Sequence, residues 1–426
     1  MKRVLFVFIC LLLIGALVAC NTTDAGHLSA STTLLNTVSY AADWSNASFS
    51  DEAYFAKLSD FSSRLYALCA EQEDGNYAFS PLSVYMAMAM LHSVGDEAVK
   101  GEVETLLGMT SADIAKTGDL FLSLLRNTSY NDDGVVNTKL DVTNSIWMDA
   151  QLTARQGALD RLANDLYCRA YRTTFRQNNA QANKDIREFI KQMTAGLIDK
   201  DFDLDADTLF ALINTLYFKD VWSDNGMDLK TEMRDFKGVD ATEITEFLIG
   251  KYTYGVTQST DVCTYYYAAT LGQYKLKLLL PNAGHTLAEA MSAENLKAVN
   301  ATKGYYAEDE KVHHYTRCVF PSFNVESDTP LKDILERNHY LTQALTAYTS
   351  DLTDQELMVS EIKHTTVLNV DKTGIEGAAV TIIADKNTSV GPIETQYHDF
   401  VLDSPFGFLL TDRNGVVLFA GQITNP

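Results

Sequence analysis

The chain has 426 residues, of which 34 are Lys or Arg and 56 are Asp or Glu, so its formal net charge is −22. Hydrophobic residues make up 46% and charged residues 21%, which is typical of a folded globular protein and excludes collagen-like and disordered chains. The excess of acidic residues disfavours non-specific binding to nucleic acid or to an anionic membrane surface.

Residues 1–19 have the pattern of an export signal. Lys2 and Arg3 precede an uncharged apolar stretch that is shorter than a typical membrane span. The stretch ends in the letters LVAC, which resemble the lipobox of bacterial lipoproteins. This resemblance implies cleavage before Cys20, lipidation of its thiol, and a lipid-anchored location in the bacterial cell envelope, facing the surface or the periplasm. An ordinary signal peptide with a chance Cys is the alternative.

Residues 20–50 are rich in Ser, Thr, Ala and Asn, and this composition predicts a flexible tether between the lipid and a body at 51–426. The body contains four cysteines without a C-x-x-C pair: Cys69, Cys168, Cys263 and Cys318. Their wide spacing disfavours a zinc or redox dithiol site, so we expect buried free thiols.

Helical patterns dominate the first half of the body. Apolar residues every three or four positions predict a helix over about 51–72. Ser80-Pro81 suits an N-cap followed by the first helical position, which predicts a second helix through 82–91. Further helices are expected at 154–168 and 183–193.

Strand patterns dominate the second half. Alternation predicts a half-buried strand at 140–148, and a nearly continuous apolar run predicts a strand buried on both faces at 209–217. Further strands are expected at 276–280, 319–325 and 357–370, around 401, and at 416–420. Because helices and strands do not alternate regularly, the order predicts an α+β fold. No Pro/Gly linker divides 51–426, which favours one domain.

No motif points to catalysis or to a cofactor. The sequence has no G-x-S-x-G elbow, no H-E-x-x-H zinc helix and no phosphate-binding loop. His313 and His314 are adjacent rather than one helical turn apart, which does not suit one shared metal ion. We therefore expect neither a metal nor a cofactor, and a hydrolase has no motif in its favour.

The segment 370–392 is unusual for a loop. It reads VDKTGIEGAAVTIIADKNTSVGP, in which small residues are followed by four consecutive β-branched ones. Loops longer than about 12–15 residues are uncommon and are usually functional or disordered. The β-branched run argues against simple disorder.

Five motifs in chain order resemble those of the serpins, over nearly all of 51–426. They are NYAFSPLS at 76–83, TAGLI at 194–198, LINTLYFK at 212–219 with Trp222, Ser360 with His364, and the C-terminal pair PF at 405–406 and FAG at 419–421. The resemblance implies a serpin fold of the α+β class, with a large central mixed β-sheet, two smaller sheets and about eight or nine helices. It also implies an exposed reactive-centre loop at about 371–400.

The serpin hinge motif G-x-E-A-A-A-A-T corresponds to GIEGAAVT at 374–381. The resemblance therefore implies seven hinge residues: Gly374, Ile375, Glu376, Gly377, Ala378, Ala379 and Thr381. On insertion every second side chain faces the sheet interior, beginning with Ile375, whereas Glu376 faces outward. Ile375, Gly377, Lys372 and Ser322 each differ from the residue usual in the family, and the last two remove an ion pair at the top of the sheet.

The resemblance implies a suicide-substrate inhibitor of serine proteases, which traps the acyl-enzyme by inserting the cleaved loop into the central sheet. Counting from Gly374 gives Thr388-Ser389 as the reactive bond, with Lys386 as the alternative. Thr388 suits elastase-like or subtilisin-like proteases, Lys386 suits trypsin-like ones, and a cysteine protease is a further candidate target. We expect a monomer that forms a covalent 1:1 complex and binds no nucleic acid. The alternative is a non-inhibitory lipoprotein of the same fold with a binding or structural role.

Trp222 matches the breach tryptophan of the family, and four residues match the positions that gather under its opening sheet: Ser80, Ser83, Asn214 and His364. A hydrogen-bonded buried polar cluster with no further role is the simpler interpretation of these residues. Both interpretations can hold, because such a cluster sets how readily the sheet opens.

Overall fold

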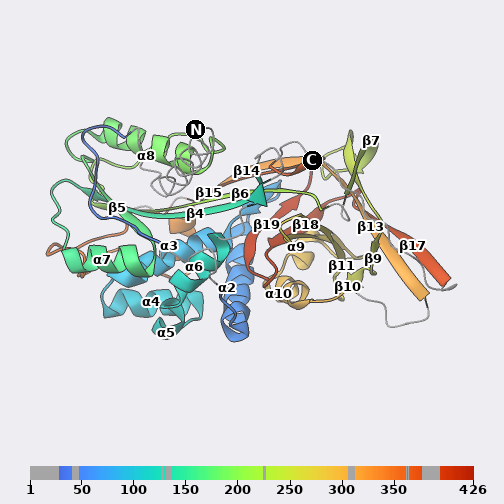
Figure 1. The fold of residues 1–426 in the computed structure, drawn as a ribbon, viewed down its shortest axis with the longest axis horizontal. Coiled ribbons are helices and arrows are strands. Elements are labelled where there is room, and N and C mark those ends of the chain that lie inside the picture. The colour runs from blue at the N-terminus through green and yellow to red at the C-terminus, as the bar shows by residue number, and fades with distance from the viewer. Residues whose placement is uncertain are drawn as a thin grey trace, which may run out of the picture.

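The computed structural model describes residues 28–40, 48–125, 129–130, 136–223, 227–305, 312–360, 362, 364–376 and 394–426. Within these ranges three β-sheets and ten helical segments build an α+β body (Figure 1), which confirms the expected fold class. Two of the helical segments, α5 and α9, are only four residues long. Among the described residues, no helix has the length and apolar character needed to span a membrane.

The helices begin where the sequence supplies N-caps. Ser80 accepts a hydrogen bond from the backbone N–H of Ser83, and Pro81 takes the first helical position of α3, as the sequence predicts. The helices are α2 (Glu52–Ala70), α3 (Pro81–Val94), α4 (Glu97–Leu107), α5 (Ser111–Ile114), α6 (Thr117–Leu125), α7 (Gln156–Asp165), α8 (Asn179–Met193), α9 (Leu287–Ala290), α10 (Ala293–Ala301) and α11 (Leu331–Arg337).

The largest sheet has eight strands and is mixed, because β4 pairs parallel with β5 and antiparallel with β6. Its order is β1-β5-β4-β6-β16-β15-β14, with β3 paired to β4. The strands are β1 (Thr33–Leu34), β3 (Ser129–Tyr130), β4 (Val136–Asp149), β5 (Cys168–Thr173), β6 (Phe210–Val221), β14 (Phe323–Thr329), β15 (His364–Asp371) and β16 (Gly374–Ile375).

Two smaller sheets complete the body. The six-stranded sheet has the order β10-β11-β12-β18-β19-β2, and the five-stranded sheet has the order β17-β13-β8-β7 with β9 paired to β13. Their strands are β2 (Tyr77–Phe79), β7 (Met227–Lys237), β8 (Thr242–Gly250), β9 (Thr253–Tyr254), β10 (Gln258–Ser259), β11 (Cys263–Ala269), β12 (Lys275–Pro281), β13 (Val312–Pro321), β17 (Glu394–Val401), β18 (Phe406–Thr411) and β19 (Val417–Ile423).

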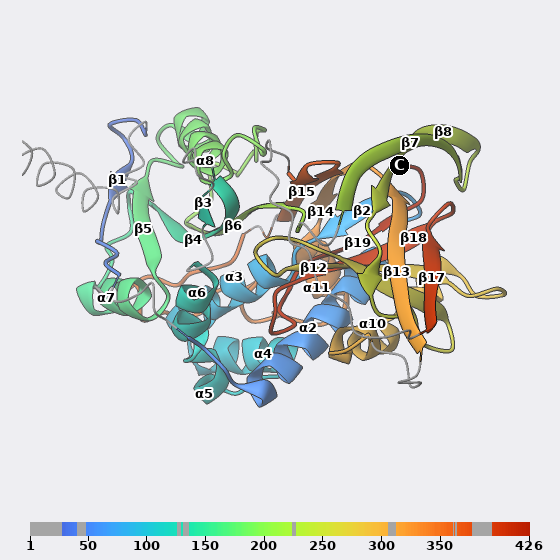
Figure 2. The ribbon, with the colours of Figure 1, turned by 45° about the vertical axis from the view of Figure 1, so that its right-hand side comes forward.

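Helices cover both faces of the large sheet. Helix α3 packs against β6 and β19 inside the main hydrophobic core. Helix α8 lies on the other face (Figure 2), where Phe189 packs in a second cluster with Trp147 and Tyr171. Residues on the two faces of β6 therefore belong to different apolar clusters, which explains its nearly continuous apolar sequence.

Two strand predictions need correction. The expected strand at 357–370 begins only at His364, because Leu357 and Val359 are buried in an irregular segment rather than in the sheet. The expected strand at 319–325 is two strands, since β13 ends at Pro321 and Ser322 carries the chain into β14 of another sheet. In both segments the apolar pattern reflects buried side chains, and it does not show whether the backbone pairs with a neighbouring strand.

The N-terminal segment differs from the flexible tether expected over 20–50, because residues 28–40 lie on the body. Thr33 and Leu34 form β1, which pairs with β5 at the edge of the large sheet. Ser29 and Thr32 donate hydrogen bonds from their hydroxyls to the buried carboxylate of Asp185 on α8, at 2.6 and 2.5 Å. Hydrogen bonds from small polar side chains thus help to hold this segment on the body.

The four cysteines of the body are free and buried, as expected from their spacing. Burial raises the pKa of the Cys69 thiol to about 12, so this side chain is not a reactive thiolate at neutral pH. In the described part of the chain, no group of three or more His, Cys, Asp or Glu side chains could hold a metal ion.

Candidate functional site

The chain turns back directly after β15 and enters the large sheet as the two-residue strand β16. Gly374 pairs with Val221 of β6 on one side and with Asp371 of β15 on the other. Ile375 takes the next position of both ladders. The beginning of the predicted hinge is thus already a strand between β6 and β15.

The turn between β15 and β16 is held by Asp371 and Trp222. The Asp371 carboxylate accepts hydrogen bonds from the backbone N–H and the hydroxyl of Thr373, at 2.7 and 2.6 Å. The indole N–H of Trp222 donates to the Asp371 carbonyl oxygen at 2.8 Å, and the indole meets the ring of Phe320 edge-on. Trp222, predicted to lie at the site of sheet opening, therefore binds the turn that begins the loop.

Gly374 is required by the close approach of β6. A Cβ atom at this position would lie 2.1 Å from the carbonyl oxygen of Asp220 and 2.8 Å from the Cα of Val221. Both atoms belong to backbone within a sheet and cannot move aside cheaply. Any side chain at residue 374 would push β16 away from β6.

Ile375 and Glu376 mark the limit of this insertion. The Ile375 side chain is fully buried in the main core, on the inward face predicted from alternation. The next residue, Glu376, still donates its backbone N–H to the Asn369 carbonyl at 2.7 Å, but it has a left-handed backbone with φ of 65°. A left-handed conformation is strained for a residue other than glycine.

The side chain of Glu376 lies on the outer face, beside Tyr217 of β6. The Tyr217 hydroxyl donates a hydrogen bond to the Glu376 carboxylate. The Oε2 atom of this carboxylate is buried without a hydrogen-bond partner. Burial raises the pKa of Glu376, and the hydrogen bond from Tyr217 and the charges of Lys219 and Lys139 only partly offset this effect. The first uninserted residue is therefore held in an unfavourable environment.

Beyond Ile375 no described residue fills the strand position between β6 and β15. Among the described strands, β6 and β15 have no backbone pairing with each other, and only β16 lies between them. A cavity of about 100 Å³ follows this gap, with α3 beneath and α8 above. Four of the five residues predicted to control sheet opening line it: Ser80, Ser83, Asn214 and His364.

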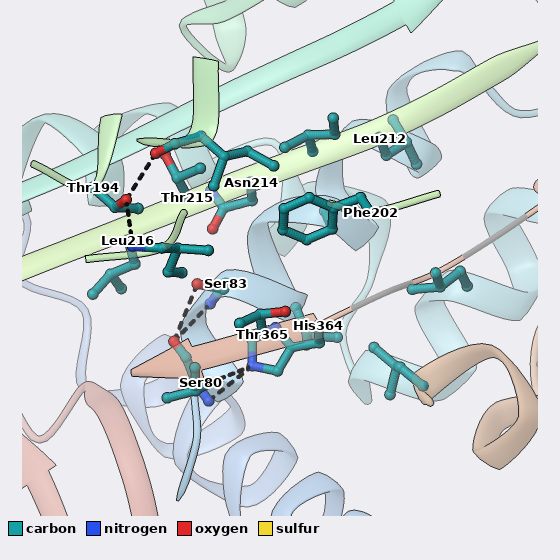
Figure 3. Close-up of a pocket in the computed structure, with 18 of the residues that line it drawn as sticks. Ser80, Ser83, Thr194, Phe202, Leu212, Asn214, Thr215, Leu216, His364 and Thr365 are labelled. Carbon is teal, nitrogen blue, oxygen red and sulfur yellow. Dashed lines mark hydrogen bonds between the residues drawn. The ribbon is translucent and has the colours of Figure 1, made fainter. Parts of the chain in front are cut away.

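Ser80, Ser83 and His364 are brought together on one side of the cavity (Figure 3). The backbone N–H of Ser80 donates to Nε2 of His364 at 3.1 Å, and the hydroxyls of Ser80 and Ser83 are also 3.1 Å apart. His364 is packed against Phe79, with ring centroids 4.6 Å apart. Burial lowers the pKa of His364 to about 4, so the ring that accepts the Ser80 N–H is neutral.

Asn214 lies across the cavity from this group (Figure 3) and is not bonded to it. Its side-chain N–H donates to the Oδ1 of Asn144 on β4 at 2.8 Å. Its own Oδ1 and the neighbouring hydroxyl of Thr215 are buried without a hydrogen-bond partner. Unpaired buried polar atoms are uncommon in folded proteins. The β6 wall of the cavity therefore carries polar atoms whose hydrogen-bonding capacity is not fully used.

The segment that follows α8 closes the gap from outside. Leu197, Phe202 and Leu204 line the cavity. Lys200, in the same segment, binds Glu326 and Asp328 of β14 at 2.9 and 2.5 Å. The segment therefore spans from α8 to a strand beyond β15, a contact that no local sequence pattern indicated.

At the top of the sheet, Ser322 and Lys372 differ from the residues that are usual in the family, and the structure shows what takes their place. Ser322 donates its backbone N–H to the carbonyl of Glu246 at 2.8 Å, and Lys372 is exposed in the turn. The hydrogen bonds of Asp371 and Trp222 hold this turn where the family has an ion pair.

Several predicted residues lie outside the described residues: Cys20, Gly377, Ala378, Ala379, Thr381, Lys386, Thr388 and Ser389.

Comparison with known proteins gives a consistent result. Residues 56–426 match the family model described as serpin (serine protease inhibitor). Serpin-Z2A of Triticum aestivum is 26% identical over 378 residues, covering 84% of this chain and 91% of the relative. Human neuroserpin is 25% identical over 406 residues, covering 89% of this chain and 92% of the relative.

The fold has close neighbours among solved structures. A crystal structure of tengpin, a thermophilic serpin in its native state, superposes with a TM-score of 0.75 and 20% sequence identity. The match covers 93% of this chain and all of that chain. Identity at this level supports the shared fold alone.

Proposed function

This chain belongs to the serpin family, whose model is described as serine protease inhibitor, and we propose that it is a suicide-substrate inhibitor of serine endopeptidases. The protease serine attacks the carbonyl carbon of Thr388, and the peptide bond to Ser389 breaks. The serine proton passes through the protease's general base to the new amino group of Ser389. Insertion of the freed loop then carries the ester-linked protease away before water can hydrolyse the ester.

The observation that carries this proposal is the open strand position between β6 and β15. β16 occupies only its first two residues, Gly374 and Ile375. A strand that continued from β16 would pair with β6 on one side and with β15 on the other. The uncleaved form is then a kinetically trapped state, and the strain at Glu376 adds to the drive for insertion.

The observed register predicts which loop residues would enter the cavity. Ile375 lies opposite Asp220 of β6 and Val370 of β15. Continuing both antiparallel ladders would set Thr381 opposite Asn214 and His364. Gly377, Ala379 and Thr381 would then share the inward face of Ile375, which suits their small or uncharged side chains. The Thr381 hydroxyl would also be placed toward the unpaired Oδ1 of Asn214.

We further propose that the protein is anchored to a bacterial envelope membrane through a lipid on Cys20, facing the surface or the periplasm. Residues 21–27 separate Cys20 from Leu28, the first described residue, which packs against the cluster under α8. The eight residue steps from Cys20 to Leu28 span at most about 29 Å. The anchor would therefore hold the body close to the membrane, on the side of β1 and α8.

The proposal is tested by incubating the mature chain, with Cys20→Ser to prevent lipidation, with trypsin, elastase and subtilisin. We expect a band at the summed mass on a denaturing gel with at least one protease, and mass spectrometry of the released peptide then identifies the reactive bond. Cleavage after Thr388 would support the elastase-like or subtilisin-like class, and cleavage after Lys386 the trypsin-like class. Cleavage without a covalent band and without a rise in melting temperature would leave the non-inhibitory alternative.

A further inference from the structure

The strand that follows the reactive loop carries a surface that loop insertion does not use. β17 begins at Glu394 and is the edge strand of the five-stranded sheet, where it pairs in parallel with β13. Residues 394–399 are exposed on both faces of the strand. Figures 1 and 2 show β13 and β17 side by side at the end of the molecule away from α7 and α8.

Tyrosine rings cover one face of this pair of strands. Tyr315 of β13 lies opposite Tyr397 of β17, and their rings stack with centroids 5.7 Å apart. Tyr252 meets Tyr397 edge-on at 4.9 Å, and Tyr254 meets Tyr315 edge-on at 5.7 Å. We call these four residues, Tyr252, Tyr254, Tyr315 and Tyr397, the tyrosine platform.

The platform is exposed, and hydrogen bonds restrain the Tyr252 ring within it. Tyr397 is 62% exposed, Tyr254 47% and Tyr252 37%. The hydroxyl of Tyr252 donates to Oδ1 of Asp399 at 2.7 Å, and Arg317 binds both oxygens of the same carboxylate at 2.7 and 2.9 Å. The Arg317 guanidinium also lies over the Tyr252 ring at 4.7 Å. Rings fixed in this way lose little conformational freedom on binding a partner.

The exposure and the contiguity of these rings indicate an interaction surface. Scattered exposed apolar residues are normal, but contiguous exposed aromatic rings mark interaction surfaces. Tyrosine is enriched among the residues that contribute most to protein–protein affinity, because it combines apolar area with a hydroxyl and few rotatable bonds. The hydrogen bonds of Asp399 link β17 to Arg317 of β13 and to Tyr252, and they thereby fix the orientation of the Tyr252 ring.

We propose that the tyrosine platform is a docking surface for the target protease, adjacent to the reactive bond. This inference rests on the proposed inhibitory function. Glu394 follows Ser389 by five residues, which span at most about 18 Å, and Tyr397 lies three residues further along β17. A protease–inhibitor interface buries about 800 Å² on each partner, equivalent to a disc of about 16 Å radius. Ser389 and Tyr397 are therefore at most about 28 Å apart, which is less than the diameter of about 32 Å of such a disc. One interface can include both the reactive bond and the platform, which adds contacts independent of the loop sequence.

Tyr397→Ala and Tyr254→Ala test the docking role, with Gln396→Ala as the matched control. Gln396 is an exposed neighbour of Tyr397 on the same strand, and alternation directs its side chain to the opposite face. With a protease that the wild type traps, we expect the tyrosine variants to associate 5 to 30 times more slowly. The stoichiometry of inhibition should not change, because it depends on insertion. Gln396→Ala should stay within about twofold of the wild type.

A binding measurement separates docking from chemistry. The test uses an inactive form of the same protease, with its catalytic serine replaced by alanine. Its dissociation constant should rise by the same factor in the tyrosine variants. Equal rates and equal affinities for wild type and tyrosine variants would overturn the docking role while leaving inhibition intact. Absence of any covalent complex with the wild type would refute the proposed function instead. Concentration-dependent dimers that Tyr397→Ala abolishes would assign the platform to self-association and also overturn the proposal.

Discussion

The indole N–H of Trp222 donates a hydrogen bond to the backbone carbonyl of Asp371, 2.8 Å away, across the start of the reactive loop. Trp222 extends from the end of β6, and Asp371 is the last residue of β15. These two strands must separate further if the loop is to insert between them. The contact therefore ties the two sides of the opening at the point where β16 enters.

Trp222→Phe removes this donor while retaining a ring against Phe320. The Asp371 carbonyl loses its partner, and we expect a loss of about 1–3 kcal/mol of stability. Amide hydrogen exchange at Gly374 and Ile375 should become faster, because the turn that holds β16 is loosened. Trp147→Phe is the matched control, since it removes a hydrogen bond to Ser145 beneath α8. Equal exchange at β16 in the two variants would show that Trp222 has no local role at the hinge.

Charges introduced on the two faces of the inserting strand should have unequal effects. In the register set by Ile375, residue 379 would face the core and residue 378 would face outward, beside Tyr217. Ala379→Arg would bury a charge, which costs several kcal/mol. We therefore expect this variant to be cleaved as a substrate, with at least a tenfold rise in the stoichiometry of inhibition. Ala378→Arg should retain most of the covalent complex on denaturing gels. The reverse order of effects would show that the register shifts by one residue during insertion.

Acidification should weaken the contacts of His364. The pKa of this residue is lowered to about 4 in the folded protein, against about 6.5 when unfolded, so the unfolded state binds more protons between these values. Stability that is present above pH 6.5 is therefore lost as pH falls toward 4, by up to about 3 kcal/mol. Protonation also ends the acceptance of the Ser80 N–H at Nε2.

Urea unfolding of wild type and His364→Gln at pH 7 and pH 5 isolates this effect. Burial raises the pKa of Asp220 and of Asp412 to about 6, and these groups change stability in the opposite sense over an overlapping range. Their contributions are common to both proteins and cancel in the comparison. The wild type should lose more stability than His364→Gln between the two pH values. Equal losses would exclude His364 as the titrating group.

Much of the body follows from local sequence signals. Ser80 and Pro81 specify the start of α3, and the alternation through Leu140 and Val142 specifies β4. The hinge was predicted because its small residues stand in an otherwise unexplained segment, and Ile375, its second residue, faces inward as alternation predicts. These features depend on neighbours in the chain, so one sequence suffices to read them.

The features that sequence did not reveal depend on distant partners. Asn214 was expected to join Ser80 and His364, but it bonds Asn144 on the adjacent strand and lies across the cavity. The N-terminal segment looked like a tether because its composition, rich in Ser, Thr, Ala and Asn, buries little apolar surface; Asp185, more than 150 residues away, accepts hydrogen bonds from its hydroxyls. The tyrosine platform likewise exists only because β13 and β17 pair in parallel.

Lys200 provides the last test, because it fastens the segment that covers the gap. Its ammonium binds Glu326 and Asp328 on β14, so the segment after α8 is held over the position that an inserting strand must occupy. Partly exposed ion pairs contribute at most about 1 kcal/mol, which corresponds to about a fivefold change in a rate. We therefore expect Lys200→Gln to accelerate insertion two- to fivefold with little loss of stability.

The readout is uptake of a synthetic peptide with the sequence of residues 374–387, followed by native gel electrophoresis, which requires no protease. Lys191→Gln is the control, since Lys191 pairs with Asp199 on the same side of the gap. Acceleration in both variants would indicate general loosening of α8, and acceleration in neither would show that the segment is not fastened by Lys200.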